Sequence, residues 1–123
     1  MEDRFVDTLY EFKGLWDRPS KCGLKIIEGS EKLLVIFTEL YNDNPGTSIT
    51  NASALLATQF LKERNLDPQK VIFVEHTPDN TSKLSFYDEA FYIVTYNWTG
   101  DAFENPVWEQ VGLDRIEELI KSI

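Results

Sequence analysis

The chain has 123 residues, 42% of them hydrophobic, and carries a formal net charge of -9. This length and composition suit one compact domain with a hydrophobic core. A single cysteine excludes an intramolecular disulfide, and one cysteine with one histidine excludes the usual zinc sites. The N-terminus lacks the pattern of a signal peptide, and no stretch approaches the roughly 18 apolar residues of a membrane span. We therefore expect a soluble, cytoplasmic protein.

The negative charge is concentrated in the last third of the chain. Residues 84–123 contain eight acidic and two basic side chains, and so carry -6 of the total charge. Binding to nucleic acid requires a clustered basic surface, which argues against a nucleic acid partner. A basic protein partner, or mimicry of nucleic acid, fits the sign of the charge. The alternative is an acidic, solvated surface that only keeps the protein soluble.

Two apolar runs, residues 24–27 and 33–40, flank Gly29 and Ser30 and predict a β-hairpin. A two-residue turn would place glycine at a position of positive φ. The same turn would set Ile26 opposite Leu33 and Leu24 opposite Val35. Alternation along residues 33–40 then puts Phe37 and Glu39 on one face, and both faces are apolar, so we expect this strand to be central.

A helix is predicted over residues 48–64, between this strand and a second one at residues 71–76. Thr47, Ser48 and Thr50 are candidate N-caps. The stop signals are Asn65, which suits a left-handed C-cap, and Pro68. The apolar positions of the helix have three- and four-residue spacing: Ile49, Ala52, Leu56 and Phe60. A strand, helix, strand order predicts a right-handed crossover and two parallel strands.

The remaining segments complete an α+β domain. The run 89–98 predicts a strand antiparallel to 71–76, and 102–111 predicts a short edge segment interrupted by Pro106. A C-terminal helix begins with Asp114 and Glu117 spaced as a capping box. Residues 5–16 fit either a helix or a strand, and their aromatic and β-branched types favour a strand. We expect one domain over 1–123, with a mixed β-sheet, one right-handed β-α-β crossover, hairpins and a C-terminal helix.

Polar side chains follow both predicted parallel strands. Glu39 ends the first strand, and Glu75 and His76 end the second. Ligands of such sheets bind beyond the carboxyl ends of the strands, near helix N-termini. Glu39, Glu75 and His76 are therefore candidates for acid and base chemistry or for binding a divalent ion. The candidate ligand-binding residues lie between strand and helix: Asn44, Gly46, Ser48, Thr50 and Asn51.

These residues also have structural explanations. Glu39 can accept hydrogen bonds from a helix N-terminus, and the hydroxyl residues are what a capped helix start carries. The run Asn44-Pro45-Gly46 is ordinary turn chemistry. A glycine-rich phosphate loop and a serine hydrolase elbow are absent from the sequence.

Aromatic residues gather in the last third of the chain. Tyr96, Trp98, Phe103 and Trp108 are close in sequence, and we expect them to close one end of the core. Trp108 alternatively serves as an exposed anchor for a protein partner.

The stretches "TELYNDNPGTSITNAS", "FVEHTP" and "ENPVW" resemble a family of small uncharacterised bacterial proteins. The resemblance covers roughly residues 16–108 and implies a bacterial origin, but no activity. It groups the site candidates named above, apart from Trp108, as matching positions. This chain has Thr77 where the family pattern suggests an aromatic residue, so a ring contact there is in doubt.

Two function classes follow from the sequence. The first is a small acidic protein-binding or regulatory module that acts through Trp108 and the acidic last third. The second is a small-ligand or metal-dependent enzyme with its site at Glu39, Glu75 and His76. The sequence names no cofactor and no oligomeric state.

Overall fold

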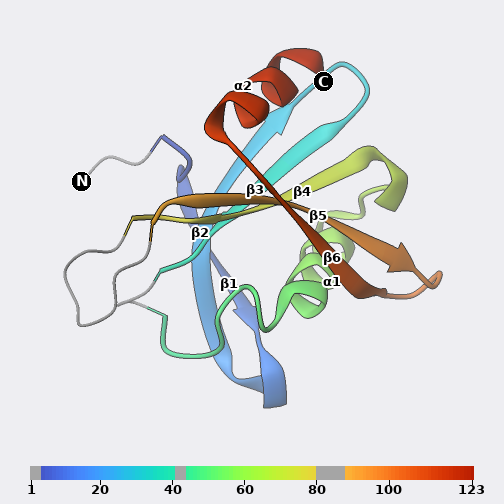
Figure 1. Cartoon of the computed structure of the whole chain (residues 1–123). Coiled ribbons are helices and arrows are strands. Elements are labelled where there is room, and N and C mark those ends of the chain that lie inside the picture. The colour runs from blue at the N-terminus through green and yellow to red at the C-terminus, as the bar shows by residue number, and fades with distance from the viewer. Residues whose placement is uncertain (1–3, 41–43, 80–87) are drawn as a thin grey trace.

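The computed structural model describes residues 4–40, 44–79 and 88–123. Within these ranges, six strands form one sheet in the order β1-β2-β3-β4-β5-β6. The strands are β1 (Thr8–Lys13), β2 (Pro19–Glu28), β3 (Leu33–Thr38), β4 (Val71–Thr77), β5 (Ala90–Trp98) and β6 (Phe103–Val111). The helices are α1 (Ser53–Arg64) and α2 (Leu113–Ser122), with 3₁₀ turns at Leu15–Asp17 and Pro68–Lys70. Figure 1 shows α1 and α2 on opposite sides of the twisted sheet.

The predicted mixed sheet and the parallel central pair are confirmed. β3 pairs with β4 in parallel, whereas every other neighbouring pair in the described sheet is antiparallel. α1 lies between β3 and β4 in the chain, as a crossover between parallel strands requires. The carboxyl ends of the two parallel strands therefore lie at the same end of the sheet.

Both faces of β3 are buried, because each face has its own helix. On the α1 face, Val35 and Phe37 pack with Phe60 in one hydrophobic cluster. On the α2 face, Leu34 and Ile36 join a second cluster that includes α2. Burying each of these side chains contributes roughly 2 kcal/mol to stability. The alternation predicted for this strand is confirmed.

The predicted register of the β2–β3 hairpin is wrong by two residues. Ile26 lies opposite Val35 and Leu24 opposite Phe37, so the loop has four residues rather than two. A shift of two preserves the face of each side chain, which is why the predicted faces still hold. Gly29 also lacks a positive φ, since the glycine with positive φ in the described chain is Gly100.

Gly29 is required instead for a close approach to the C-terminus. A Cβ atom on Gly29 would lie 2.3 Å from the carbonyl oxygen of Ile123. The same oxygen accepts a hydrogen bond from Ser30 N at 2.9 Å. Ile123, the C-cap of α2, is thus held against the β2–β3 loop.

The predicted start of α1 is also wrong. The helix begins at Ser53, and its N-cap is Ala52, which offers no side-chain bond. Ser48 instead closes a preceding turn, in which its Oγ accepts from Asn51 N at 3.2 Å. Thr47 and Thr50 lie before the helix as well. The predicted end is confirmed, since Asn65 is left-handed with φ 52°.

The capping box predicted for α2 is absent. Gly112 is the N-cap of this helix and makes no side-chain hydrogen bond. Ile116 and Leu119 of α2 are buried in the cluster on this face of the sheet. Packing, and not capping chemistry, holds this helix to the sheet.

The edges of the sheet differ from the prediction only for β6. β1 is the strand that the N-terminal composition favours. β6 is a nine-residue strand and not a short segment. Pro106 fits within it because Asn105 and Pro106 together oppose Tyr96, which makes a β-bulge, and Asn105 has φ 53°.

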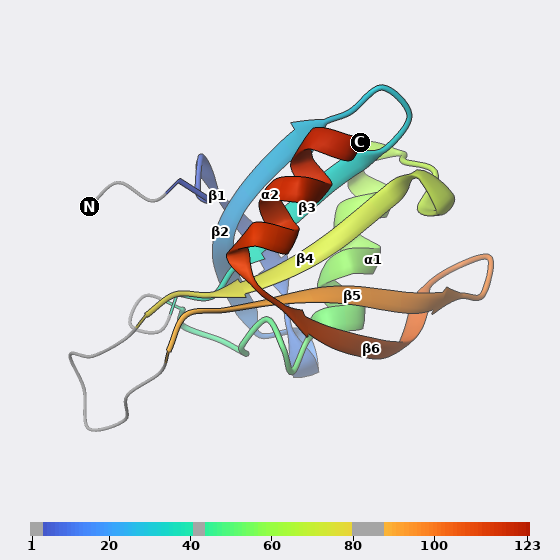
Figure 2. The same cartoon turned by 45° about the horizontal axis from the view of Figure 1, so that its top comes forward.

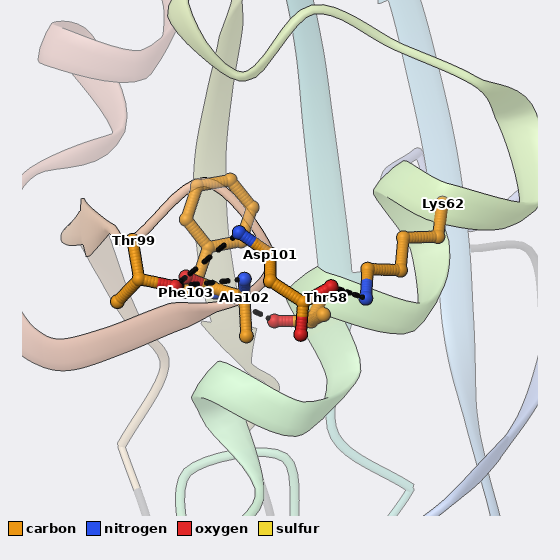
Figure 3. A network of polar contacts seen from close by, with 6 residues as sticks. All are labelled: Thr58, Lys62, Thr99, Asp101, Ala102 and Phe103. Atoms are coloured by element: carbon orange, nitrogen blue, oxygen red, sulfur yellow. Dashed lines mark hydrogen bonds and ion pairs between the residues drawn. The ribbon is translucent and has the colours of Figure 1, made fainter.

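Side chains of α1 contact both edge strands of the sheet or the turns beside them. At β1, Gln59 Oε1 accepts from Lys13 N at 2.9 Å. At β6, Thr58 Oγ1 accepts from Phe103 N at 2.9 Å, and Lys62 Nζ pairs with Asp101 at 3.0 Å (Figure 3). The turn between β5 and β6 is therefore anchored on α1.

We expect Gly29→Ala to lower the free energy of unfolding by about 1 to 3 kcal/mol, because the new methyl group overlaps Ile123. Deleting Ile123 should remove most of that cost, so the two changes should couple in a double-mutant cycle measured by urea unfolding. An equal cost with and without Ile123 would show that backbone conformation, rather than the chain end, requires glycine there.

Candidate functional site

The two candidate glutamates lie together on the α1 face. Glu39 directly follows β3, and Glu75 is in the parallel neighbour β4. The Glu39 carboxylate accepts from Ile49 N at 3.2 Å and from Leu40 N at 3.1 Å. Its charge raises the pKa of Glu75, though less than burial does. Parallel pairing predicts that Glu39 lies near Glu75 or His76 and near the helix start expected around Ser48. Glu39 does lie near Glu75 and bonds to Ile49 N, although the helix itself begins at Ser53.

The carboxyl group of Glu75 is the centre of a buried polar cluster. Ser53 Oγ donates to its Oε2 at 2.5 Å, and Trp108 Nε1 donates to its Oε1 at 2.9 Å. The hydroxyl of Tyr96 lies 2.7 Å from Ser53 Oγ. We call these four side chains the Glu75 cluster. It connects β4 with α1, β5 and β6.

Burial raises the pKa of Glu75 to about 7, against the lowering effect of hydrogen bonds from Ser53 and Trp108. Burial also raises the pKa of Glu39, and the backbone N–H groups of Ile49 and Leu40 oppose that rise. Glu75 can therefore exchange a proton near neutral pH. Such a carboxyl group has the acidity of a general acid or base.

Access to the Glu75 cluster is restricted. Glu75 is 1% and Ser53 2% exposed, whereas Trp108 is 38% exposed. Cys22 on the same face is fully buried, and burial raises the pKa of its thiol, which makes it a poor nucleophile. The cluster reaches the surface through Trp108 and the half-buried Tyr96.

His76 does not join the two glutamates, so the predicted convergence of all three is wrong. Neighbouring residues of a strand point to opposite faces, and His76 therefore points to the α2 face. Its Nδ1 lies 3.1 Å from Thr38 Oγ1, and its Nε2 lies 2.9 Å from Glu89 Oε2. Phe91 stacks on the ring at 4.6 Å. His76 is thus a buried histidine on the α2 face, and each of its two ring nitrogens has a hydrogen-bond partner.

Most of the predicted ligand-binding residues build the connection before α1. Asn44 Oδ1 accepts from Lys21 N and Gly46 N, each at 3.2 Å. Gly46 packs so closely on Ser20 that a Cβ would lie 2.0 Å from its Oγ. Residues 41–43 of the predicted binding loop lie outside the described residues.

Ser48 and Asn51 bond to each other within one turn, and Asn51 is exposed. Thr50 differs from them because its side chain contributes to lowering the pKa of Glu75, although less than Ser53 and Trp108 do. Of the five candidates, Thr50 is therefore the one that influences the cluster.

The buried polar side chains of the site are hydrogen-bonded within the protein. In the described part of the chain, every buried side-chain nitrogen or oxygen has a hydrogen-bond partner. In the same part, no three His, Cys, Asp or Glu side chains gather as ligands of a metal ion. The observed partners thus account for the cluster without a bound group.

The predicted aromatic cluster forms, but Trp108 has another role. Phe103 packs on Tyr96 at 5.0 Å and on Trp98 at 4.9 Å between ring centroids. Trp108 stands opposite Val94 on β6 and bonds to Glu75. Sequence reasoning missed Ser53, Tyr96 and Glu89, although alternation along β4 and β5 indicates which face each strand residue occupies.

Comparisons with family models, curated proteins and solved structures find no match to this chain. The resemblance to small bacterial proteins therefore stays a prediction. Among the described helices, none has the length and apolar character needed to cross a membrane.

We expect the stability of the protein to fall as the pH rises from about 5 to about 8, because folded Glu75 holds its proton up to a pKa of about 7 whereas unfolded Glu75 loses it near 4.5. The stabilisation is complete below the unfolded pKa and is lost as the pH rises through the folded pKa. Glu75→Gln has no such proton. Its free energy of unfolding should gain roughly 2 to 3 kcal/mol over the parent between these pH values.

The measurement is urea unfolding of both proteins across this pH range. Glu104→Gln, at an exposed position of β6, is the control and should follow the parent. Parallel pH profiles for Glu75→Gln and the parent would contradict a proton on buried Glu75.

Proposed function

We propose that this chain is a protein-binding module that takes a basic, extended segment of a partner along the outer edge of β6. One observation carries the proposal: Val107, 62% exposed, and Trp108, 38% exposed, are adjacent on an edge strand. Exposed apolar side chains on a sheet edge are a common feature of surfaces that bind another strand.

The backbone of β6 supports this mode of binding. In the described sheet β6 pairs with β5 alone, so its other side has no strand neighbour. Pro106 lacks an N–H group and lies in the bulge, which limits regular pairing to residues 107–111. Backbone hydrogen bonds along this stretch would supply affinity, and alternate side chains would supply specificity.

Charge favours a basic partner. Glu104 and Glu109 are exposed on β6, and the whole chain has a net charge of -9. Opposite charge increases the rate of association and disfavours wrong partners. A second copy of this chain would bring two acidic edges together, so self-association along β6 is disfavoured.

Trp108 is already oriented for contact. Its indole N–H is bonded to Glu75, which leaves the partly exposed ring in a fixed position. An anchor that is ordered before binding loses less side-chain entropy on association. Trp108 and Val107 point to opposite faces of β6, so a partner strand would meet one on each face.

The alternative function is an enzymatic or small-ligand site at the Glu75 cluster. Its support is the Ser53 hydroxyl bonded to a carboxyl group whose pKa is about 7. Ser53 and Glu75 are almost completely buried, and His76 faces away from them. Binding at the edge of β6 requires no rearrangement of buried residues, and for this reason we prefer the protein-binding function.

The proposed function predicts selective binding of a synthetic peptide of alternating lysine and valine. A fluorescent form of this peptide should bind the full chain at least tenfold more tightly than an alternating glutamate and valine peptide, as measured by anisotropy. Raising the salt from about 50 to about 300 mM should weaken the binding.

Val107→Lys tests where the peptide binds, and we expect this variant to bind the lysine and valine peptide at least tenfold more weakly than the parent does. Leu9→Lys is its matched control, because Leu9 is 54% exposed on the opposite edge strand β1. Equal affinity for the two peptides, or an equal loss in both variants, would reject the β6 edge as the binding surface.

A further inference from the structure

β4 and β5 lie side by side over only part of their lengths. Their pairing begins at Phe73 and Val94 and continues to Thr77 and Ala90. No β5 residue pairs with Val71 or Ile72, and residues 95–98 of β5 extend beyond the paired region. Figure 2 shows the two strands diverging toward the turn that joins β5 to β6. The sheet is thus split at one end between two interior strands.

The split is held open from both sides. Val71 and Ile72 continue to pair with β3, at Leu33 and Leu34. On the other side, the turn after β5 is anchored to α1 through Thr58 and Lys62 (Figure 3). At this end of the sheet β4 is thus attached to β3, whereas the turn after β5 is attached to α1.

A cleft of about 370 Å³ occupies the split. Its lining includes Phe73 and Tyr96 from the α1 face and Ile72 and Leu119 from the α2 face. Side chains from both faces line this cleft beside Val71 and Ile72, which have no partner in β5. The volume lies within the range of pockets that hold small molecules.

The interior of the cleft is apolar and aromatic. Phe73, Tyr96 and Phe103 line it and contact one another, with centroid distances of 5.0 to 5.6 Å. Aromatic rings in such a setting favour a flat, apolar group that packs edge to face. The body of a fitting ligand is therefore a single aromatic ring.

Two charged side chains, Glu109 and Arg115, also line the cleft. Arg115 is paired with Glu118 at 3.4 Å, whereas none of the ion pairs among the described residues uses Glu109. Glu109 is thus the lining charge without an ion pair among the described residues. The net charge of -9 favours the approach of cations to the chain, and Glu118 partly neutralises Arg115.

We propose that the cleft between β4 and β5 binds a small arylalkylammonium ion, with its ring against Phe73 and Phe103 and its ammonium group at Glu109. The ammonium group pairs with a carboxylate and lies near aromatic faces, which also attract cations. This site shares Glu109 with the outer edge of β6, but its ligand lies between β4 and β5.

Three probes of matched shape separate the contribution of the ring from that of the charge: phenethylamine, 2-phenylethanol and 3-phenylpropanoate. Each is titrated into the full chain while amide chemical shifts are followed by NMR. We expect the amine to bind at least tenfold more tightly than the alcohol, and the carboxylate to bind most weakly. The shifts should centre on Val71, Ile72, Thr95 and Tyr96.

Glu109→Gln should reduce the affinity for the amine to that for the alcohol and leave the alcohol unchanged. Glu104→Gln, the same change elsewhere on β6, should leave all three affinities unchanged. Thr95→Phe should fill the cleft and abolish binding of all three probes. Equal affinities for amine and alcohol, shifts centred elsewhere, or no saturable shift with any probe would overturn the proposal.

Discussion

The hydrogen bonds of the Glu75 carboxyl group connect the centre of the sheet with its outer elements. A buried carboxyl group is costly unless its oxygens are bonded. Ser53 and Trp108 supply those bonds at 2.5 and 2.9 Å. Because they come from α1 and β6, the cost of burying Glu75 fixes both elements against β4. Removing either partner would leave a buried acceptor unpaired, so these contacts specify the arrangement more than they add to its stability.

α1 determines the shape of the sheet as well as the burial of one face. It bonds to backbone groups at Lys13 of β1 and Phe103 of β6, and so curls the two edges toward itself. The same attachment draws the β5–β6 hairpin away from the start of β4. The divergence of β4 and β5 (Figure 2) and the place of β6 at the edge of the sheet are thus two features of one packing arrangement.

The sequence predicts features that depend on local pattern. Alternation in residues 33–40 predicts both buried faces of β3, and Asn65 predicts the end of α1, because each signal lies within a few residues. The start of α1 is predicted wrongly because the Ser48 hydroxyl accepts from Asn51 N as a cap would, yet it closes a separate turn before the helix begins at Ser53. The predicted position of His76 is wrong because His76 and Glu75 are neighbours in β4, and neighbouring residues of a strand point to opposite faces.

The candidate site was predicted in part for the same reason. Parallel pairing brings Glu39 and Glu75 together, and this follows from topology. Ser53, Tyr96 and Trp108 come from three other elements, and their contacts depend on how far the sheet twists and where α1 lies on it. The cleft depends on the same twist and on the contacts of Thr58 and Lys62, so no short sequence motif predicts it.

Hydrogen exchange of the tryptophan indole N–H groups, followed by NMR, tests most directly whether Glu75 holds β6. Trp108 Nε1 is bonded to a buried carboxyl group, whereas Trp16 is 87% exposed and serves as an internal reference. The account predicts that the Trp108 indole N–H exchanges at least tenfold more slowly than that of Trp16. Equal exchange rates for the two indoles would contradict it, because β6 would then be free of the contact on which its orientation depends.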